Sequence, residues 1–237
     1  MSYYDFTDKI ALISGATSGI GNSIAENLYG LGCRLFCITS SDAGRSQLLK
    51  QFTGSTVIKC NFKNTEDQAL LIKELNKIQE NIKFDILVNC AGVFPLKGIN
   101  NSSLEDFDDC FNINVRSAFA ISQCVGKKMC LNKSGRIVNI GSSSAYNGSA
   151  DAGIYCASKH ALLGLTRSLY KEFSPYDVRV YSVSPGSCQT PMGMSDKRQD
   201  FSTFITPEEV AAVVMDVLKF NAEGIMEEIR INRTVVR

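Results

Sequence analysis

The sequence contains a single histidine, His160, and no pair of cysteines separated by two residues. The spaced histidine, cysteine and acidic ligands of a zinc dehydrogenase are therefore absent, and we expect no metal site. The sequence has nine cysteines, an odd number, and they are scattered along the chain. A chain of this length can bury a core without disulfides. We expect most of the cysteines to be reduced and to pack as small apolar side chains in a cytoplasmic protein.

A strong net charge and long apolar segments are missing as well. The formal net charge is +1, which favours neither nucleic acid nor an anionic membrane as a partner. The longest apolar runs, such as VAAVVM at 210–215, are too short to cross a bilayer, and the first residues lack the basic and apolar regions of a signal peptide. We therefore expect a protein that binds neither nucleic acid nor a membrane.

The sequence does contain a regular alternation of short apolar runs and helical patterns. No repeat or linker interrupts it, so we expect residues 1–237 to form one domain. This alternation predicts an α/β fold in which a parallel sheet carries helices on both faces and binds ligands beyond the carboxyl ends of its strands. Strands are predicted at 10–14, 34–39, 56–60, 84–89, 136–140, 178–183 and 227–231, and helices at 20–31, 65–78, 104–131, 153–172 and 206–218.

A glycine-rich segment, SGATSGIG at 14–21, lies between the first predicted strand and the first predicted helix. Glycines at 15, 19 and 21 allow a tight turn and let backbone N–H groups approach a phosphate, toward which the helix N-terminus adds partial positive charge. An ordinary strand–helix turn is the alternative. The position after the first strand of a βαβ unit favours dinucleotide binding.

The end of the second predicted strand bears on which dinucleotide is bound. An acid at this position would hold the ribose 2′-hydroxyl of NAD, but the strand ends in Thr39, Ser40 and Ser41. Asp42 comes slightly later and suits a turn. Because the hydroxyls together with Arg45 could hold a 2′-phosphate, the sequence favours NADP(H) over NAD(H).

Tyr155 and Lys159 lie four residues apart in a predicted helix and therefore share one of its faces. An ammonium beside a phenol favours the phenolate and lowers the pKa of the phenol, which can then exchange a proton with a carbonyl or alcohol oxygen. An exposed tyrosine–lysine pair without function is the alternative. His160 points about 100° away around the helix and is assigned no catalytic role.

Three further segments accompany the glycine loop and the Tyr155–Lys159 pair: VNCAG at 88–92, NIGSSS at 139–144 and SPGSCQTPM at 184–192. These five segments occur in an order and at spacings that closely resemble the short-chain dehydrogenase/reductase family. This resemblance spans roughly residues 7–192 and resumes from 206 into the next helix. It implies a single-domain Rossmann-type doubly wound sheet of about seven parallel strands, NAD(P)(H) as cofactor, and a homotetramer or homodimer.

The resemblance also implies four catalytic residues. Tyr155 would be the general acid/base, and Lys159 would also hold the nicotinamide ribose. Ser142 has the family's spacing of thirteen residues before Tyr155 and would bind the substrate oxygen, although the adjacent Ser143 and Ser144 are rivals by composition. Asn114 would stabilise a helix kink that holds a water molecule in a proton relay.

The expected cofactor contacts come from several segments of the chain. The backbone of Cys188 and the hydroxyl of Thr190 would hold the carboxamide, so no catalytic thiol is expected. Cys90 replaces the second asparagine of the family's usual NNAG segment. The expected contacts are Gly15, Thr17, Ser18, Gly19, Ile20, Gly21, Ser40, Ser41, Arg45, Asn61, Phe62, Asn89, Ala91, Gly92, Tyr155, Lys159, Pro185, Gly186, Cys188 and Thr190.

The substrate-binding part is expected to be small, with a short loop at about 187–206. Phe94, Ser144, Tyr146 and Met192 would contact the substrate. The C-terminal EEIRINRTVVR lacks the glycine-rich strand typical of 3-oxoacyl-acyl-carrier-protein reductases. The sequence therefore predicts an NAD(P)(H)-dependent oxidoreductase of a small-molecule carbonyl or alcohol. The alternatives are a 3-oxoacyl-acyl-carrier-protein reductase specifically, a sugar or polyol dehydrogenase, and a non-catalytic dinucleotide-binding protein.

Overall fold

A parallel sheet of seven strands forms the centre of the molecule, in the order β4-β3-β2-β5-β6-β7-β9. The computed structural model describes residues 2–197 and 199–234. It confirms the predicted α/β fold, including the parallel pairing of the last strand with β7. The strands are β2 (Ile10–Ser14), β3 (Arg34–Thr39), β4 (Thr56–Lys59), β5 (Ile86–Asn89), β6 (Gly135–Ile140), β7 (Val178–Pro185) and β9 (Glu228–Ile231).

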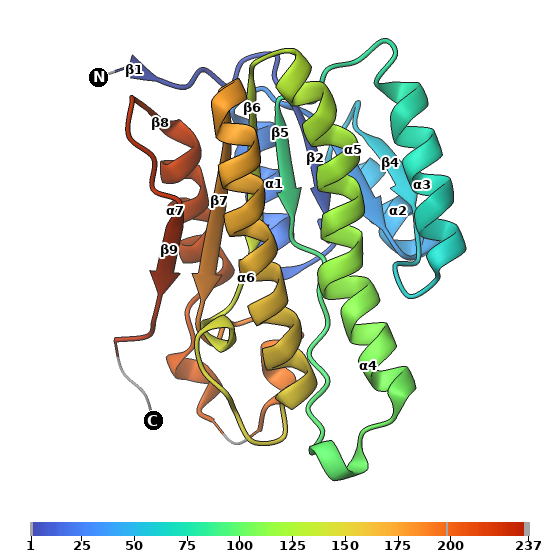
Figure 1. Cartoon of the computed structure of the whole chain (residues 1–237), viewed down its shortest axis with the longest axis vertical. Helices are drawn as coiled ribbons and strands as arrows, with labels where there is room; N and C mark the ends of the chain where they lie inside the picture. Colours follow the sequence, from blue (N-terminus) through green and yellow to red (C-terminus); the bar gives the residue numbers. More distant parts are fainter. Residues whose placement is uncertain (1, 198, 235–237) are drawn as a thin grey trace.

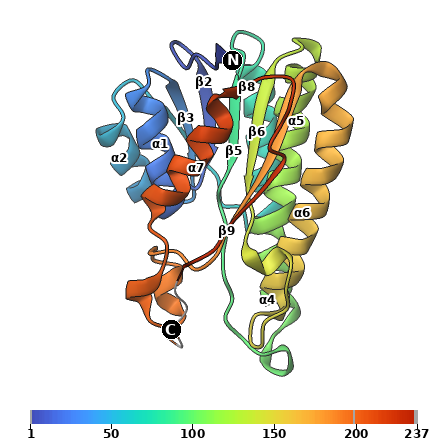
Figure 2. The same ribbon diagram turned by 90° about the vertical axis from the view of Figure 1, so that its left-hand side faces the viewer.

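Helices cover both faces of this sheet (Figures 1 and 2). One face carries α1 (Gly19–Gly30), α2 (Asp42–Gln51) and α7 (Pro207–Lys219). The other carries α3 (Thr65–Ile78), α5 (Ser117–Leu131) and α6 (Gly153–Phe173). Helix α4 (Leu104–Phe111) packs against α6 beyond the carboxyl ends of the strands (Figure 1). The sequence did not predict α2, so Asp42 begins a helix there and is not a turn residue.

The two hydrophobic cores explain why the central strands read as continuous apolar runs. Ala11 and Ile13 pack into the core on the α1 and α7 side, whereas Leu12 packs into the core on the α5 side. Successive side chains of a strand point to opposite faces, and both faces are covered here. Every residue of β5 and β6 is buried as a result.

A π-helical turn, Asn112–Arg116, interrupts the single helix that was expected at 104–131. It separates α4 from α5 and carries Asn114, which is 1% exposed. Ser117, the first residue of α5, donates from its hydroxyl to the carbonyl of Ile113 within the turn at 2.6 Å. Such turns shift the following helix relative to the preceding one, so the expected kink at Asn114 is present.

The N-terminal residues pack at the end of the sheet where the parallel strands begin, opposite to their carboxyl ends. β1 (Ser2–Tyr3) pairs in antiparallel fashion with β8 (Phe220–Asn221), which the sequence did not predict. The buried Arg136 donates from Nε to the carbonyl of Leu218 at 3.1 Å, and its guanidinium carbon lies 3.7 Å from the ring centroid of Tyr4. A cation–π contact thus joins β6 to the start of the chain.

The segment from 187 to 206 leaves the sheet after β7 and returns to α7 as a loop with joined ends. Ile205 donates from its backbone N–H to Ser187 at 3.0 Å, and Gln189 donates to the carbonyl of Ile205 at 2.8 Å. Two short 3-10 turns, Gly193–Ser195 and Phe201–Thr203, lie between these bonds. Within the described ranges, no helix has the length and apolar character that a transmembrane span requires.

A capping box begins α7. The Thr206 hydroxyl accepts from the backbone N–H of Glu209 at 3.2 Å, and the Glu209 carboxylate accepts from the backbone N–H of Thr206 at 2.7 Å. In α3 the cap is Asn64, whose side-chain oxygen accepts from the backbone N–H groups of Glu66 and Asp67.

Substitution Thr206→Ala should therefore reduce the free energy of unfolding by about 1 kcal/mol. The melting temperature should fall by about 2–4 °C in a chain of this size. Thr53→Ala, at an exposed position between α2 and β4, is the matched control and should have little effect in calorimetry. Equal destabilisation by the two substitutions would contradict the assigned cap.

Candidate active site

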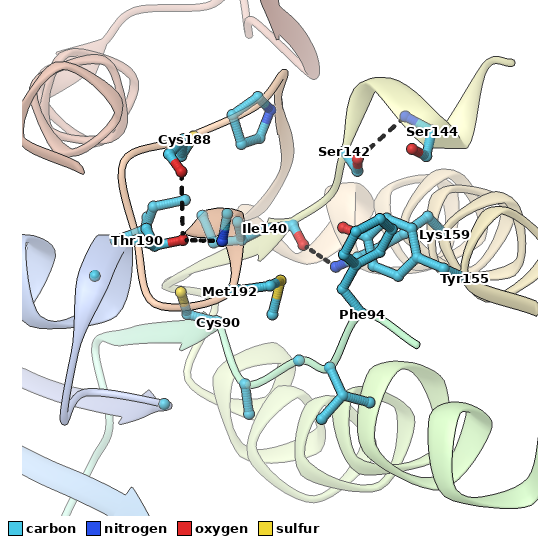
Figure 3. Close-up of a pocket in the computed structure, with 18 of the residues that line it drawn as sticks. Cys90, Phe94, Ile140, Ser142, Ser144, Tyr155, Lys159, Cys188, Thr190 and Met192 are labelled. Carbon is cyan, nitrogen blue, oxygen red and sulfur yellow. Dashed lines mark hydrogen bonds between the residues drawn. The ribbon is translucent and has the colours of Figure 1, made fainter. Parts of the chain in front are cut away.

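A cavity of about 700 Å³ opens at the carboxyl ends of the strands (Figure 3). It combines the glycine loop after β2, the ends of β3 and β4, the segment after β5, the turn after β6 and the loop after β7. The predicted residues that line it are Gly15, Thr17, Ser18, Gly19, Ile20, Gly21, Ser40, Asn61, Phe62, Ala91, Gly92, Phe94, Ser142, Ser144, Tyr155, Lys159, Pro185, Gly186, Cys188, Thr190 and Met192.

Three predicted cofactor contacts, Ser41, Arg45 and Asn89, do not line the cavity. The Ser41 hydroxyl caps α2 by accepting from the backbone N–H of Gly44 at 3.0 Å. Arg45 is an exposed residue of α2. The buried Asn89 amide donates to Asn139 at 2.8 Å and so joins β5 to β6. Its position supports strand pairing and not direct cofactor contact.

Tyr146, predicted to contact substrate, points elsewhere and is absent from the cavity lining. Its hydroxyl donates to Glu228 at 3.1 Å, and the guanidinium of Arg230 lies 4.3 Å from its ring centroid. Both partners belong to β9, which holds the tyrosine against the edge of the sheet.

The glycine loop has the shape that a dinucleotide phosphate requires. Gly15 and Gly19 have φ angles of +75° and +54°, a region that side chains disfavour. A Cβ at Gly19 would lie 2.8 Å from the Cγ2 of Thr190, so a side chain there would close this part of the cavity. The Ser18 side chain makes no capping bond to α1, and the first turn contains no acid. Its N–H groups are therefore available to an anion.

The charged residues that line the described part of the cavity are mainly cationic. They are Lys63, Lys159 and Arg233, against the single carboxylate of Asp196. This imbalance suits an anionic ligand, because a cavity with one sign of charge attracts the opposite sign. Together with the available N–H groups at the start of α1, this cationic cavity fits an anionic cofactor such as a nicotinamide dinucleotide.

Ser142, Tyr155 and Lys159 converge on one wall of the cavity (Figure 3). Ser142 follows β6, and its hydroxyl accepts from the backbone N–H of Ser144 at 3.1 Å. Tyr155 stacks edge-on against Phe94 with ring centroids 4.7 Å apart. Lys159 Nζ donates to the carbonyl of Ile140 at 2.9 Å and lies 5.8 Å from the Tyr155 ring centroid. The shared face predicted for tyrosine and lysine is present.

Burial controls the pKa values of this pair. Desolvation raises the pKa of Tyr155 to about 12, although a hydrogen bond with Ser142 acts in the opposite direction. Desolvation also lowers the pKa of Lys159 to about 8. The lowered phenol pKa expected from sequence is therefore wrong for the protein without cofactor, since burial penalises both charged forms.

Asn114 lies behind the cavity wall. Its Oδ1 accepts from the backbone N–H of Val93 at 2.8 Å, and its Nδ2 donates to the Val93 carbonyl at 3.0 Å and to the Ser158 hydroxyl at 3.0 Å. The π-helical turn directs this side chain toward the segment after β5. Asn114 thus fixes Gly92 and Val93, which do line the cavity.

The loop after β7 presents Cys188 and Thr190 to the cavity. The carbonyl of Cys188 accepts from the backbone N–H of Thr190 at 2.8 Å, and the Thr190 hydroxyl accepts from the backbone N–H of Gly193 at 3.0 Å. Burial raises the pKa of the Cys188 thiol to about 12. A thiol with this pKa is protonated at neutral pH and is a poor nucleophile.

His160 is exposed, does not line the cavity, and has its Nδ1 2.8 Å from the carbonyl of Cys156. Over the described ranges, no group of three or more histidine, cysteine or acidic residues could hold a metal ion. Sequence reasoning missed several lining residues that come from the loops: Lys63, Asn147, Ser149, Asp196, Gln199, Phe204 and Arg233. Only their neighbourhood to the predicted motifs could have indicated them.

Comparisons with known proteins agree with this geometry. The sequence model of the short chain dehydrogenase family matches residues 9–200. A 3-oxoacyl-acyl-carrier-protein reductase of Rickettsia bellii is 33% identical over 222 residues, which cover 89% of each protein.

Solved structures are similar over nearly the whole chain. One from Beutenbergia cavernae, attributed to an NAD(P)-dependent gluconate 5-dehydrogenase and holding NADP at low occupancy, has a TM-score of 0.86 at 25% identity and covers 97% of both chains. A 4-hydroxyisoleucine dehydrogenase complexed with NADH has a TM-score of 0.84 at 26% identity, covering 95% of this chain and 98% of that chain.

The family match and the cavity at the strand ends agree on the class of protein. The protein is an oxidoreductase that uses a nicotinamide dinucleotide as cofactor. The chain belongs to the short-chain dehydrogenase family, as its motifs predicted. It is an NAD(P)-dependent enzyme that acts on a carbonyl or alcohol group.

The lowered pKa of Lys159 leads to a test of stability against pH. Since the pKa is about 8 in the folded protein and 10.5 ordinarily, the unfolded state binds more protons between these values, and burying Lys159 costs stability below pH 8. Lys159→Met should therefore stabilise the cofactor-free protein at pH 7, by about 1–3 kcal/mol.

This gain should shrink as the pH rises from 8 to 10.5, because wild-type Lys159 then loses its charge. Chemical denaturation of both proteins across this range measures the difference. Lys127→Met, a change at an exposed residue of α5, is the control for loss of one charge. A constant difference between Lys159→Met and wild type would show that Lys159 is not buried as an ammonium.

Proposed function

We propose that this enzyme reduces a carbonyl group of a small polar substrate with NADPH, using Ser142, Tyr155, Lys159 and Asn114. The supporting observation is that the Ser142 and Tyr155 side chains line the same cavity as the glycine loop, with the Lys159 ammonium buried beside them. When bound, the nicotinamide supplies a hydride to the carbonyl carbon or accepts one from an alcohol carbon.

The protein supplies the proton and the polarisation. The Ser142 hydroxyl donates a hydrogen bond to the carbonyl oxygen and stabilises the negative charge that develops there. Tyr155 gives its phenolic proton to the same oxygen, so that C=O becomes CH–OH after one hydride and one proton have been added. The resulting phenolate needs a new proton before the next turnover.

The raised pKa of Tyr155 supports reduction at neutral pH. A phenol with a pKa of about 12 holds its proton and is ready to act as an acid. In the reverse direction the phenolate is required as a base, and its population rises with pH. Lys159, with a pKa of about 8, is suited to returning the proton to Tyr155. Asn114 positions the backbone of Val93, whose N–H group donates to the asparagine Oδ1.

The substrate end of the cavity favours a polar molecule. Ser144 and Asn147 contribute a hydroxyl and an amide group there. A long acyl chain would leave such groups without hydrogen-bond partners. Reduction of a 3-oxoacyl thioester is the second candidate, supported by the 33% identity to the reductase of Rickettsia bellii. The oligomeric state and the cytoplasmic location stay predictions.

Substitution Tyr155→Phe should reduce turnover by about 10²–10⁴-fold, because the general acid is lost. The affinity for the nicotinamide cofactor, measured by fluorescence titration, should change little. Activity is screened with ketoses and with acetoacetyl thioesters, which separates the two substrate candidates. Tyr176→Phe, at an exposed residue, is the control and should retain full activity.

If Tyr155→Phe keeps wild-type turnover, the assigned acid is wrong. A wild-type protein that binds NADPH but reduces no carbonyl compound would instead support a non-catalytic dinucleotide-binding protein. Binding of neither nucleotide would contradict both.

The proposed preference for NADPH rests on the strand end at β3. Ser40 lines the cavity there, whereas the nearby carboxylate of Asp42 is occupied by an ion pair with Lys59 at 2.5 Å. Without a carboxylate aimed at the ribose, a 2′-phosphate meets no repulsion.

Ser40→Asp should reverse this preference, because a carboxylate binds the 2′-hydroxyl of NADH and repels the 2′-phosphate of NADPH. We expect the dissociation constant of NADPH, divided by that of NADH, to rise by about 10-fold or more. A factor of about 10 corresponds to one charge interaction of the size that shifts a pKa by one unit. Ser46→Asp, exposed on α2, controls for the added charge. Tighter binding of NADH than NADPH by the wild type would refute the proposed preference.

A further inference from the structure

Arg233 follows β9 by two residues and is a cation that lines the cavity. We propose that Arg233 determines substrate specificity by binding an anionic group, a carboxylate or a phosphate, that the substrate carries apart from its carbonyl. This inference rests on the proposed function, because it takes the reacting carbonyl to lie at Ser142 and Tyr155.

The charge of Arg233 is held by neutral partners. Nη1 donates to the Thr203 hydroxyl at 3.0 Å and Nη2 to the Gln199 side-chain oxygen at 2.5 Å. The guanidinium carbon lies 5.0 Å from the Phe204 ring centroid. Since a guanidinium has five N–H donors, these two bonds leave donors for a ligand. None of the ion pairs found within 2–197 and 199–234 includes Arg233.

One carboxylate lies in the same part of the cavity. Gln199 donates from Nε2 to Asp196 at 2.9 Å, and its side-chain oxygen accepts from Arg233. The amide therefore lies between the carboxylate and the guanidinium. This chain of hydrogen bonds orients Arg233 through Gln199. The remaining N–H donors of the guanidinium are left for an anion. Paired hydrogen bonds to a carboxylate or phosphate suit the planar guanidinium.

The strand order places Arg233 on the substrate side. The glycine loop follows β2, Ser142 follows β6, and Arg233 follows β9. With a strand spacing of about 4.8 Å, the end of β9 lies about 19 Å from that of β2 but about 10 Å from that of β6. The end of β9, which Arg233 follows, is thus nearer to the strand end of Ser142 than to that of the glycine loop. A substrate that reaches Arg233 carries its anionic group several bonds away from the carbonyl.

A structural alternative exists and predicts different results. Arg233 joins the end of β9 to Gln199, Thr203 and Phe204 of the 187–206 loop, and it could act only as a clamp for that loop. A clamp would support turnover of every substrate to the same extent. An anion site would support only anionic substrates, mainly through KM.

The experiment compares matched substrates that differ in charge. These are 4-oxopentanoate against its methyl ester, and dihydroxyacetone phosphate against dihydroxyacetone, each reduced with NADPH. In wild type we expect a higher kcat/KM for the anion of at least one pair. Arg233→Gln should lower that kcat/KM by about 10- to 100-fold, the value of a charged hydrogen bond, mostly by raising KM. The neutral partner should change by less than about 3-fold.

Two further variants separate charge from clamping. Arg233→Lys keeps the charge and should restore part of the anion preference, although without paired hydrogen bonds. Thr203→Val removes one clamp bond but keeps the charge, and should retain the preference of the wild type. The pair that shows the effect identifies the anion as carboxylate or phosphate.

Several outcomes would overturn the proposal. Equal losses on anionic and neutral substrates in Arg233→Gln would make the residue a clamp. Weaker NADPH binding by this variant would assign it to the cofactor. A wild-type preference for the neutral compounds, or a preference for anions that Arg233→Gln retains, would also refute it.

Calorimetric binding of 4-oxopentanoate and dihydroxyacetone phosphate to the NADP⁺ complex provides a readout that does not require turnover. Binding to wild type that is lost in Arg233→Gln supports the anion site even if no carbonyl is reduced, in which case only the proposed function fails. Absence of binding to wild type, together with absence of turnover, overturns the anion site as well.

Discussion

The parallel pairing of the strands is the constraint on which the rest of this structure depends. It places the carboxyl ends of all seven strands at one edge of the sheet. Residues far apart in sequence, such as Gly19, Ser142 and Thr190, meet there because each follows a different strand. The Asn89–Asn139 hydrogen bond joins β5 and β6 near this edge. Both asparagines are buried and join the two central strands beneath the cavity.

Behind the cavity wall, the protein places polar groups in an environment from which water is excluded. Lys159 is 5% exposed and Asn114 is 1% exposed, and each is satisfied by a backbone carbonyl or by a neighbouring side chain. Such groups are fixed in orientation by their partners, and low local dielectric strengthens their interactions. The same environment accounts for the opposite pKa shifts of Tyr155 and Lys159.

The sequence predicted all seven strands of the main sheet, and most of the expected site residues line one cavity. Both depend on local patterns, since apolar runs mark buried strands and motifs follow them directly. It missed α2, in which Leu48 is the main buried apolar side chain, so that little periodicity shows. It also missed the π-helical turn, because helical spacing continues through residues 104–131. The orientation of Tyr146 and the position of Arg233 could not be predicted, as both depend on contacts with distant segments, Glu228 and Gln199 respectively.

The joined ends of the 187–206 loop have a consequence for how this enzyme can diversify. The bonds between Ser187, Gln189 and Ile205 close the loop at its base, and the capping box at Thr206 begins α7 independently of the residues in between. Side chains from 199 to 203, which lie between these two fixed points, can therefore change with little effect on the sheet or on the glycine loop. New substrate preferences can arise there while the cavity wall of Ser142, Tyr155 and Lys159 stays unchanged.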